Sequence, residues 1–80
     1  MYIEIITKAL EVITPENNVN VINEELSQAL TNEGYPNILC LGILHTPSLY
    51  EAVIMDGLNM NAGPIVQFKY DFQDRELQIL

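Results

Sequence analysis

The sequence is short of basic residues. Its 80 residues include three Lys and Arg against eleven Asp and Glu, which gives a net charge of −8 at pH 7. Lys and Arg neutralise phosphates and supply most of the affinity of proteins for nucleic acids, so this balance argues against direct nucleic-acid binding. An acidic surface instead attracts basic proteins and speeds the encounter with them.

Cysteine and histidine occur once each, as Cys40 and His45. A single cysteine excludes an internal disulfide framework and fits a reducing compartment. A single histidine excludes a paired-histidine metal site. Residues five apart on one strand face opposite sides, so Cys40 and His45 do not form a nucleophile and base pair. We therefore expect no enzyme activity, no catalytic or metal-binding residues and no cofactor.

Long apolar runs are absent as well. No stretch reaches the roughly 18 consecutive apolar residues of a membrane span, and the chain does not open with a basic region followed by an apolar block. A chain of this length is expected to fold as one domain, residues 1–80, with a small core. These features predict a soluble intracellular protein that does not bind membranes.

The N-terminal part of the chain predicts helix, strand and helix. Residues 2–12 carry apolar side chains at helical spacing. Val19 and Val21 then alternate with Asn18 and Asn20, which is typical of a short strand. This strand runs directly into a second helix, for which Asn23 is the expected N-cap. The second helix is expected to end before Gly34.

The C-terminal part predicts four further strands, at residues 38–44, 51–55, 64–70 and 76–80. Residues 71–75 read as a hairpin turn whose charges, including Lys69 and Arg75 among the nearby acids, pair locally. The predicted fold class is therefore α+β, with helix, strand and helix followed by four strands. Together the strands would form a five-stranded, mostly antiparallel sheet flanked by two helices.

The second predicted helix carries an acidic face. Glu24, Glu25 and Gln28 point away from its apolar stripe. Such faces are most often only solvated, but up to Gln67 the chain has eight acids and a single base, Lys8. Oxygens on such a strand and helix recur about 5 to 7 Å apart and can occupy the hydrogen-bond donors of a DNA-binding groove. The pattern favours mimicry of a nucleic acid by shape and charge.

Five stretches resemble a known family: NNVNVINEELSQAL, NILCLGIL, YEAVIMD, GPIVQFKY and the terminal ELQIL. Over most of the chain they are similar, in this order, to the uracil-DNA glycosylase inhibitor family of the phage PBS type, known as Ugi. The resemblance implies a phage protein that acts against base excision repair in the cytoplasm of the host bacterial cell. It also implies a monomer that forms a 1:1 complex with uracil-DNA glycosylase and occupies the DNA-binding groove of the enzyme.

The resemblance also implies which residues make the contacts. The edge strand and the second helix would accept hydrogen bonds that the enzyme normally gives to phosphates. The implied partner-binding residues are Glu16, Asn17, Asn18, Val19, Asn20, Val21, Glu24, Glu25, Gln28 and Asp56. An apolar pocket between the second helix and the sheet would take the leucine that the enzyme inserts into the duplex during base flipping. The implied pocket residues are Val21, Leu26, Ala29, Leu30, Cys40, Val53 and Met55.

Some positions depart from the family pattern. Asn17 and Asn18 stand where the family has Glu and Ser, and Gln28 replaces a glutamate. These amides accept hydrogen bonds but bring no charge, so the departures bear on the choice of target. Two alternatives stay open: a DNA mimic that inhibits another host defence nuclease, of the restriction or CRISPR kind, and a non-catalytic assembly module that pairs an exposed strand with a partner strand.

Overall fold

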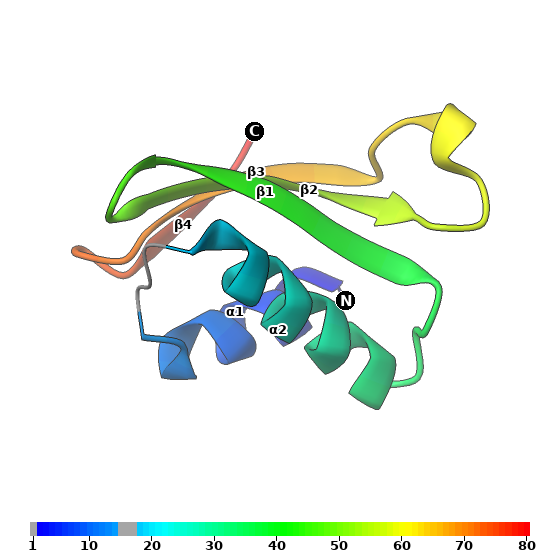
Figure 1. The fold of residues 1–80 in the computed structure, drawn as a ribbon, viewed down its shortest axis with the longest axis horizontal. Helices are drawn as coiled ribbons and strands as arrows, with labels where there is room; N and C mark the ends of the chain where they lie inside the picture. Colours follow the sequence, from blue (N-terminus) through cyan, green and yellow to red (C-terminus); the bar gives the residue numbers. More distant parts are fainter. Residues whose placement is uncertain (1, 15–17) are drawn as a thin grey trace.

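Two helices pack on one face of an antiparallel sheet (Figure 1). The computed structural model describes residues 2–14 and 18–80. The elements are, in chain order, α1 (Tyr2–Val12), α2 (Val19–Asn32), β1 (Ile38–Thr46), β2 (Leu49–Asp56), the 3-10 turn η1 (Met60–Ala62), β3 (Val66–Asp71) and β4 (Glu76–Ile79). The four strands lie in the order β1-β2-β3-β4. The predicted α+β class is confirmed. No helix in the described ranges is long and apolar enough to cross a membrane.

The predicted first strand is instead part of a helix. Val19 is the first residue of α2, and Asn18 is its N-cap. The side-chain oxygen of Asn18 accepts from the backbone N–H of Asn20 at 3.0 Å. The predictions of a fifth strand at these residues and of an N-cap at Asn23 are therefore wrong.

The spacing of the apolar residues explains why this segment is helical. Val19, Ile22, Leu26 and Leu30 are spaced three, four and four residues apart, which is the period of one helix face. Ile22, Leu26 and Leu30 have no exposed surface. Burying one such side chain contributes roughly 1.5 to 3 kcal/mol, whereas β-propensity spans only about 1 kcal/mol. Burial of the helical stripe therefore outweighs the strand preference of the two valines.

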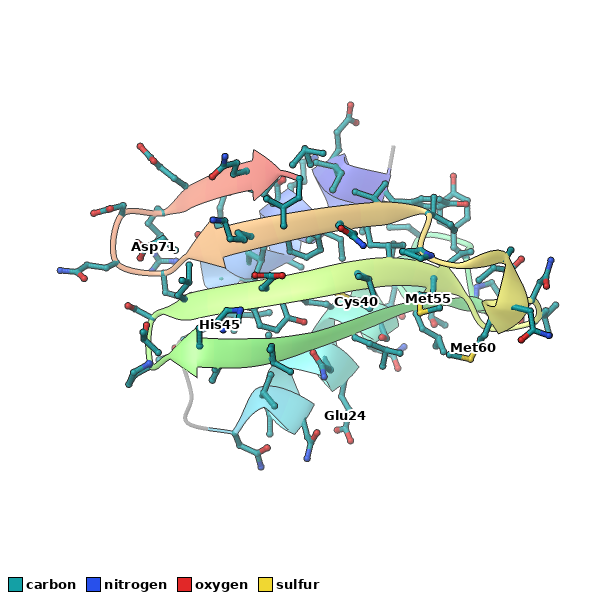
Figure 2. All side chains as sticks on the ribbon, turned by 90° about the horizontal axis from the view of Figure 1, so that it is seen from above. Glu24, Cys40, His45, Met55, Met60 and Asp71 are labelled. Carbon is teal, nitrogen blue, oxygen red and sulfur yellow. The ribbon has the colours of Figure 1, made fainter. Side chains whose placement is uncertain are left out.

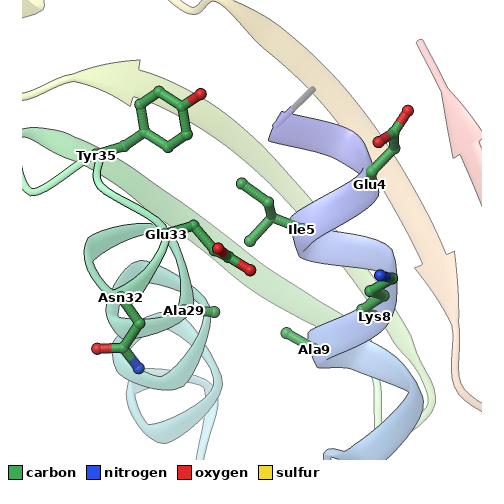
Figure 3. Close-up of a pocket in the computed structure, with 8 residues that line it drawn as sticks. All are labelled: Glu4, Ile5, Lys8, Ala9, Ala29, Asn32, Glu33 and Tyr35. Atoms are coloured by element: carbon green, nitrogen blue, oxygen red, sulfur yellow. The ribbon is translucent and has the colours of Figure 1, made fainter.

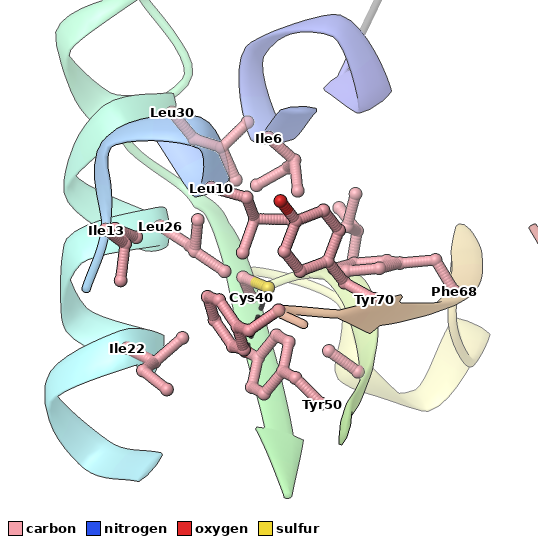
Figure 4. Close-up of a cluster of buried hydrophobic side chains, with 13 residues drawn as sticks. Ile6, Leu10, Ile13, Ile22, Leu26, Leu30, Cys40, Tyr50, Phe68 and Tyr70 are labelled. Carbon is pink, nitrogen blue, oxygen red and sulfur yellow. Dashed lines mark hydrogen bonds between the residues drawn. The ribbon is translucent and has the colours of Figure 1, made fainter. Parts of the chain in front are cut away.

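One apolar core lies between the helices and the sheet (Figure 4). Both helices and three strands contribute to it. Its buried residues are Ile6, Leu10, Ile13, Ile22, Leu26, Leu30, Cys40, Tyr50, Ala52, Ile54, Phe68, Tyr70 and Phe72. Along β2 buried residues alternate with half-buried ones, so alternate side chains point to the face of the sheet that the helices leave uncovered.

The predicted hairpin at residues 71–75 is confirmed, but its arginine does not pair locally. The Arg75 N–H donates to the Asp71 carbonyl at 2.7 Å, and the Asp71 side chain accepts from the N–H of Gln73 at 2.8 Å. The Arg75 guanidinium reaches α1, where it donates to the carbonyls of Leu10 at 3.5 Å and Glu11 at 3.3 Å. A cation is favourable at a helix C-terminus because the last carbonyls there lack helical partners. These hydrogen bonds connect the C-terminal end of α1 to the β3–β4 hairpin and so to the sheet.

The Tyr70 side chain places a hydroxyl group inside the apolar core. Its hydroxyl is buried and, within the described part of the chain, has no hydrogen-bond partner. Desolvating an unpaired polar group costs roughly 1 to 3 kcal/mol. We therefore expect Tyr70→Phe to leave the free energy of unfolding unchanged or to raise it by up to about 1 kcal/mol.

Urea unfolding measures this effect, and Tyr50→Phe is the matched control. The Tyr50 hydroxyl donates to Asn23 Oδ1, so its removal leaves an acceptor without this donor and should lower stability by about 1 kcal/mol or more. A clear loss of stability in Tyr70→Phe would contradict the assignment of an unpartnered hydroxyl.

Candidate functional site

The exposed face of α2 is acidic and rich in amides. Glu24, Glu25, Gln28 and Asn32 are all exposed. Gln28 lies three or four residues from each of the other three, so the four side chains are neighbours on one side of the helix, here called the α2 face. Gln28 Nε2 donates to Asn32 Oδ1 at 2.9 Å, which orders two neighbouring amides. Helix α2 contains no Lys or Arg. The α2 face therefore presents hydrogen-bond acceptors with negative charge and no positive charge from its own helix.

The predicted partner-binding residues 18–21 lie at the start of the same helix. Asn18 and Asn20 are exposed there, and Val19 and Val21 are half-buried. One acceptor site of Asn18 is already used, because its side chain caps the helix. Glu16 and Asn17 lie outside the described residues.

Asp56 lies apart from these residues. It ends β2 and is half-buried. Its side chain accepts from the backbone N–H of Leu58 at 2.9 Å and so shapes the turn that follows the strand. Asp56 is therefore on the sheet, and the structure does not place it on the α2 face.

The predicted apolar pocket between α2 and the sheet is not formed. Leu26, Leu30 and Cys40 have no exposed surface and fill the core themselves. Val53 and Met55 lie on the other side of the sheet, because the buried positions of β2 are the even-numbered ones. Side chains of the chain itself occupy the space in which a leucine of a partner was expected, so this prediction is wrong.

A shallow surface groove runs between α1 and α2 (Figure 3). It encloses about 530 Å³. Ala9 and Ala29 face each other across it, and Tyr35 lies at one end. The Glu33 side chain points from the end of α2 toward α1, and Lys8 of α1 also lines the groove. Ala29 is thus the one residue of the predicted pocket that lines this groove. The lining of the groove includes charges of both signs. The groove therefore distinguishes a cationic partner from an anionic one less clearly than the α2 face does.

Side chains of α2 cover the edge of β1. Asn23 pairs with Gly42 in both directions: Nδ2 donates to the Gly42 carbonyl at 3.2 Å, and Oδ1 accepts from the Gly42 N–H at 3.0 Å. One turn later, Ser27 Oγ donates to the Cys40 carbonyl at 3.4 Å and accepts from the Cys40 N–H at 3.0 Å. A neighbouring strand would make the same kind of bonds. Helix α2 therefore takes the place of the predicted fifth strand at this edge.

Sequence reasoning missed this role of Asn23 and Ser27. Both residues are half-buried, and they stand one turn apart beside the apolar stripe of α2. A helix read from Val19 onward would have placed these two small polar side chains next to the core, where they need partners. The four-residue spacing of Asn23 and Ser27 could therefore have indicated from the sequence that both side chains bond to a neighbouring element.

A hydrogen-bond network lies behind this edge. The Tyr50 hydroxyl donates to Asn23 Oδ1 at 2.5 Å and lies 3.5 Å from Cys40 Sγ. Burial raises the pKa of Cys40 from its ordinary 9.0 to about 11, although the hydrogen bond with Tyr50 acts in the opposite direction. Burial also raises the pKa of Tyr50, and the neighbouring Cys40 adds to this rise. Both groups are therefore uncharged at neutral pH.

We expect Cys40 to resist thiol reagents in the folded protein. The reactive form of a cysteine is the thiolate, and the buried Cys40 thiol stays protonated at pH 8 because its pKa is about 11. Modification by Ellman's reagent at pH 8 should be at least about a hundredfold slower than in guanidinium-unfolded protein. Rapid labelling of the native protein would contradict the buried network.

The same pKa predicts how stability depends on pH. Because the folded thiol has the higher pKa, its protonated form contributes stability that is fully present below about pH 9 and is lost as the pH rises to about 11.

His45 lies away from Cys40, as predicted. It is exposed, and its Nε2 is 3.0 Å from Glu51 Oε1. In residues 2–14 and 18–80, no group of three or more His, Cys, Asp or Glu side chains is placed to hold a metal ion.

In comparisons with known proteins, no protein-family model, no curated protein and no solved structure matched the chain. The resemblance to the uracil-DNA glycosylase inhibitor family therefore stays a prediction.

Proposed function

We propose that the chain is a non-catalytic protein inhibitor that mimics DNA, with uracil-DNA glycosylase as its first candidate target. The observation that supports the proposal is the α2 face, on which two carboxylates and two amides lie together on one side of a helix that contains no basic residue. A groove that binds a phosphate backbone offers cationic and N–H donors, and the α2 face can accept from several of them at once.

The helix gives the side chains of the α2 face a fixed spacing. Residues four apart on a helix are separated by about 6 Å along its axis. Leu26 and Leu30 are fully buried, and Asn23 and Ser27 bond to β1. The opposite side of the helix is therefore anchored, and the carboxylates reach a partner without ordering the helix first, which lowers the cost of binding.

The proposal differs in two ways from the one that the sequence suggested. It assigns the contact to a helix face, since the expected edge strand is absent from the described residues. It includes no pocket for a leucine of the enzyme between α2 and the sheet, since the core fills that space. Inhibition then depends mainly on charge and hydrogen bonding, so it should weaken steeply as salt is added.

The direct test is excision of uracil from an oligonucleotide by a purified bacterial uracil-DNA glycosylase. Excision should stop when the added protein reaches the concentration of the enzyme. Full activity at a large excess of the protein would contradict this target. Capture of a different DNA-binding enzyme of a host defence system, with loss of its activity, would then favour the alternative inhibitor of a restriction or CRISPR nuclease.

No observation favours strand pairing at β1. Asn23 and Ser27 already bond to the backbone groups of Gly42 and Cys40. A partner strand would have to displace α2 from this edge, so we do not propose an assembly module there.

A further inference from the structure

The outer face of the sheet is turned away from the helices (Figure 2). The strand register divides it into a mostly apolar part on β1 and β2 and a polar part on β3. Residues that pair across the strands share a face, so the register gives two neighbouring rows. These rows are Leu41–Val53–Gln67 and Ile43–Glu51–Lys69. Their β1 and β2 members are apolar except Glu51, and their β3 members are polar.

The apolar half is exposed in spite of its composition. Leu41 is 41 % and Ile43 is 57 % exposed. Leu39 and Met55 form the next row and are half-buried. Apolar side chains on neighbouring strands form a continuous patch, and such patches commonly mark binding sites.

A groove of about 330 Å³ crosses this patch between the two rows. Gly42 and Ala52 occupy the inward-facing positions of β1 and β2, so their backbone forms the floor of the groove on the outer face. Leu41 and Val53 form one wall, and Ile43 and Glu51 form the other. Asn23 and Gln67 line its remaining parts. The groove therefore combines apolar walls with one carboxylate.

Charge indicates what kind of molecule fits the groove. Among the described residues that line it, Glu51 is the only one with a carboxylate, which is 42 % exposed and contacts His45. The chain as a whole has a net charge of −8. A second copy would bring together two strongly acidic chains, and an anionic membrane surface would be repelled. A basic protein is attracted instead.

We propose that this groove binds a segment of a basic protein in which an apolar side chain stands next to a Lys or Arg. The apolar side chain packs between Leu41, Val53 and Ile43, and the cation pairs with the Glu51 carboxylate. The groove lies on the outer face of the sheet and reaches the edge of β1, where Asn23 of α2 lines it, but no residue of the α2 face lines it. The inference is therefore independent of the enzyme that the α2 face binds.

A peptide titration followed by NMR tests this proposal. The probe is a short synthetic peptide of alternating leucine and lysine, and the control peptide replaces each leucine by serine. The amide signals of the ¹⁵N-labelled full chain should shift at Leu41, Gly42, Ile43, Glu51 and Val53. The leucine peptide should bind about tenfold more tightly than the serine peptide, because only its apolar side chains gain burial.

Variants show whether the peptide binds to the groove or only to the acidic surface of the protein in general. Ile43→Ser should weaken binding of the leucine peptide about tenfold, and Glu51→Gln about threefold or more. Leu58→Ser is the matched control, because Leu58 is 77 % exposed and does not line the groove, and it should bind like the wild type. A dispersed spectrum of each variant shows that it is folded.

Three results would overturn the proposal. The first is a set of shifts confined to the α2 face. The second is equal affinity for the two peptides. The third is a set of shifts at the groove residues that grows with protein concentration without peptide, which would assign the patch to a second copy. Glycosylase inhibition is not a readout here, so failure of this proposal leaves the proposed function untouched, and the reverse also holds.

Discussion

Asn23→Ala is expected to lower the free energy of unfolding by about 2 to 4 kcal/mol. Asn23 is bonded to the carbonyl and N–H of Gly42 and to the hydroxyl of Tyr50. Alanine removes all three bonds and leaves three polar groups, partly shielded from water, without these partners. Each such group costs roughly 1 to 3 kcal/mol when it is fully desolvated, and less where water reaches it. Urea unfolding followed by circular dichroism measures the loss.

Asn20→Ala is the matched control for this experiment. It removes the same side chain from the same helix, but Asn20 is exposed. Its stability should stay within about 0.5 kcal/mol of the wild type. Equal losses for Asn20→Ala and Asn23→Ala would show that the bonds from α2 to β1 do not stabilise the fold.

The same variant should also change the behaviour of β1 as an edge strand. Without Asn23, the N–H and carbonyl of Gly42 have no partner from α2. Unpaired backbone groups on an edge strand are a template for pairing with another chain. We therefore expect Asn23→Ala to associate with rising concentration in analytical ultracentrifugation, whereas Asn20→Ala should sediment like the wild type.

Glu24→Lys and Glu25→Lys, made together, are expected to weaken the complex with the target enzyme by about a hundredfold or more at low salt. Two carboxylates that accept from a basic groove would become two cations that the groove repels. Both residues are exposed and lie beyond the first turn of α2. The melting temperature should therefore change by no more than about 5 °C. Inhibition assays and thermal unfolding separate the two effects.

The control for charge reversal changes the net charge by the same amount elsewhere. Asp74→Lys and Glu76→Lys, made together, alter two exposed acids at the β3–β4 hairpin. This variant should inhibit within about threefold of the wild type at moderate salt, where the Debye length is about 8 to 10 Å. Equal losses for the two double variants would mean that net charge alone, and not the α2 face, determines binding.

Elements with a long periodic pattern could be predicted from the sequence. The spacing of Ile3, Ile6, Leu10 and Ile13 predicted the first helix, and α1 spans Tyr2–Val12. The acidic side of the second helix was also predicted correctly, because the spacing of Glu24, Glu25 and Gln28 depends only on the helical period.

The errors come from short windows and from tertiary contacts. Val19 and Val21 alternate as in a strand, but only Ile22 and the residues after it show that the helical face continues. The position of Asn23 against Gly42 depends on how α2 packs on β1, which local patterns do not contain. The predicted pocket combined residues from both faces of the sheet, although the two-residue period of β2 places Val53 on the face opposite to the core.

A competition experiment tests the central claim that the α2 face occupies a DNA-binding groove. Fluorescently labelled uracil-containing DNA is bound to a catalytically inactive uracil-DNA glycosylase, and the protein is added while anisotropy is recorded. We predict that the anisotropy falls to the value of free DNA near one equivalent of the wild-type protein, and that the variant with Glu24→Lys and Glu25→Lys does not displace the DNA at the same concentration. DNA that stays bound at a large excess of the wild-type protein, or displacement by both proteins alike, would contradict the claim.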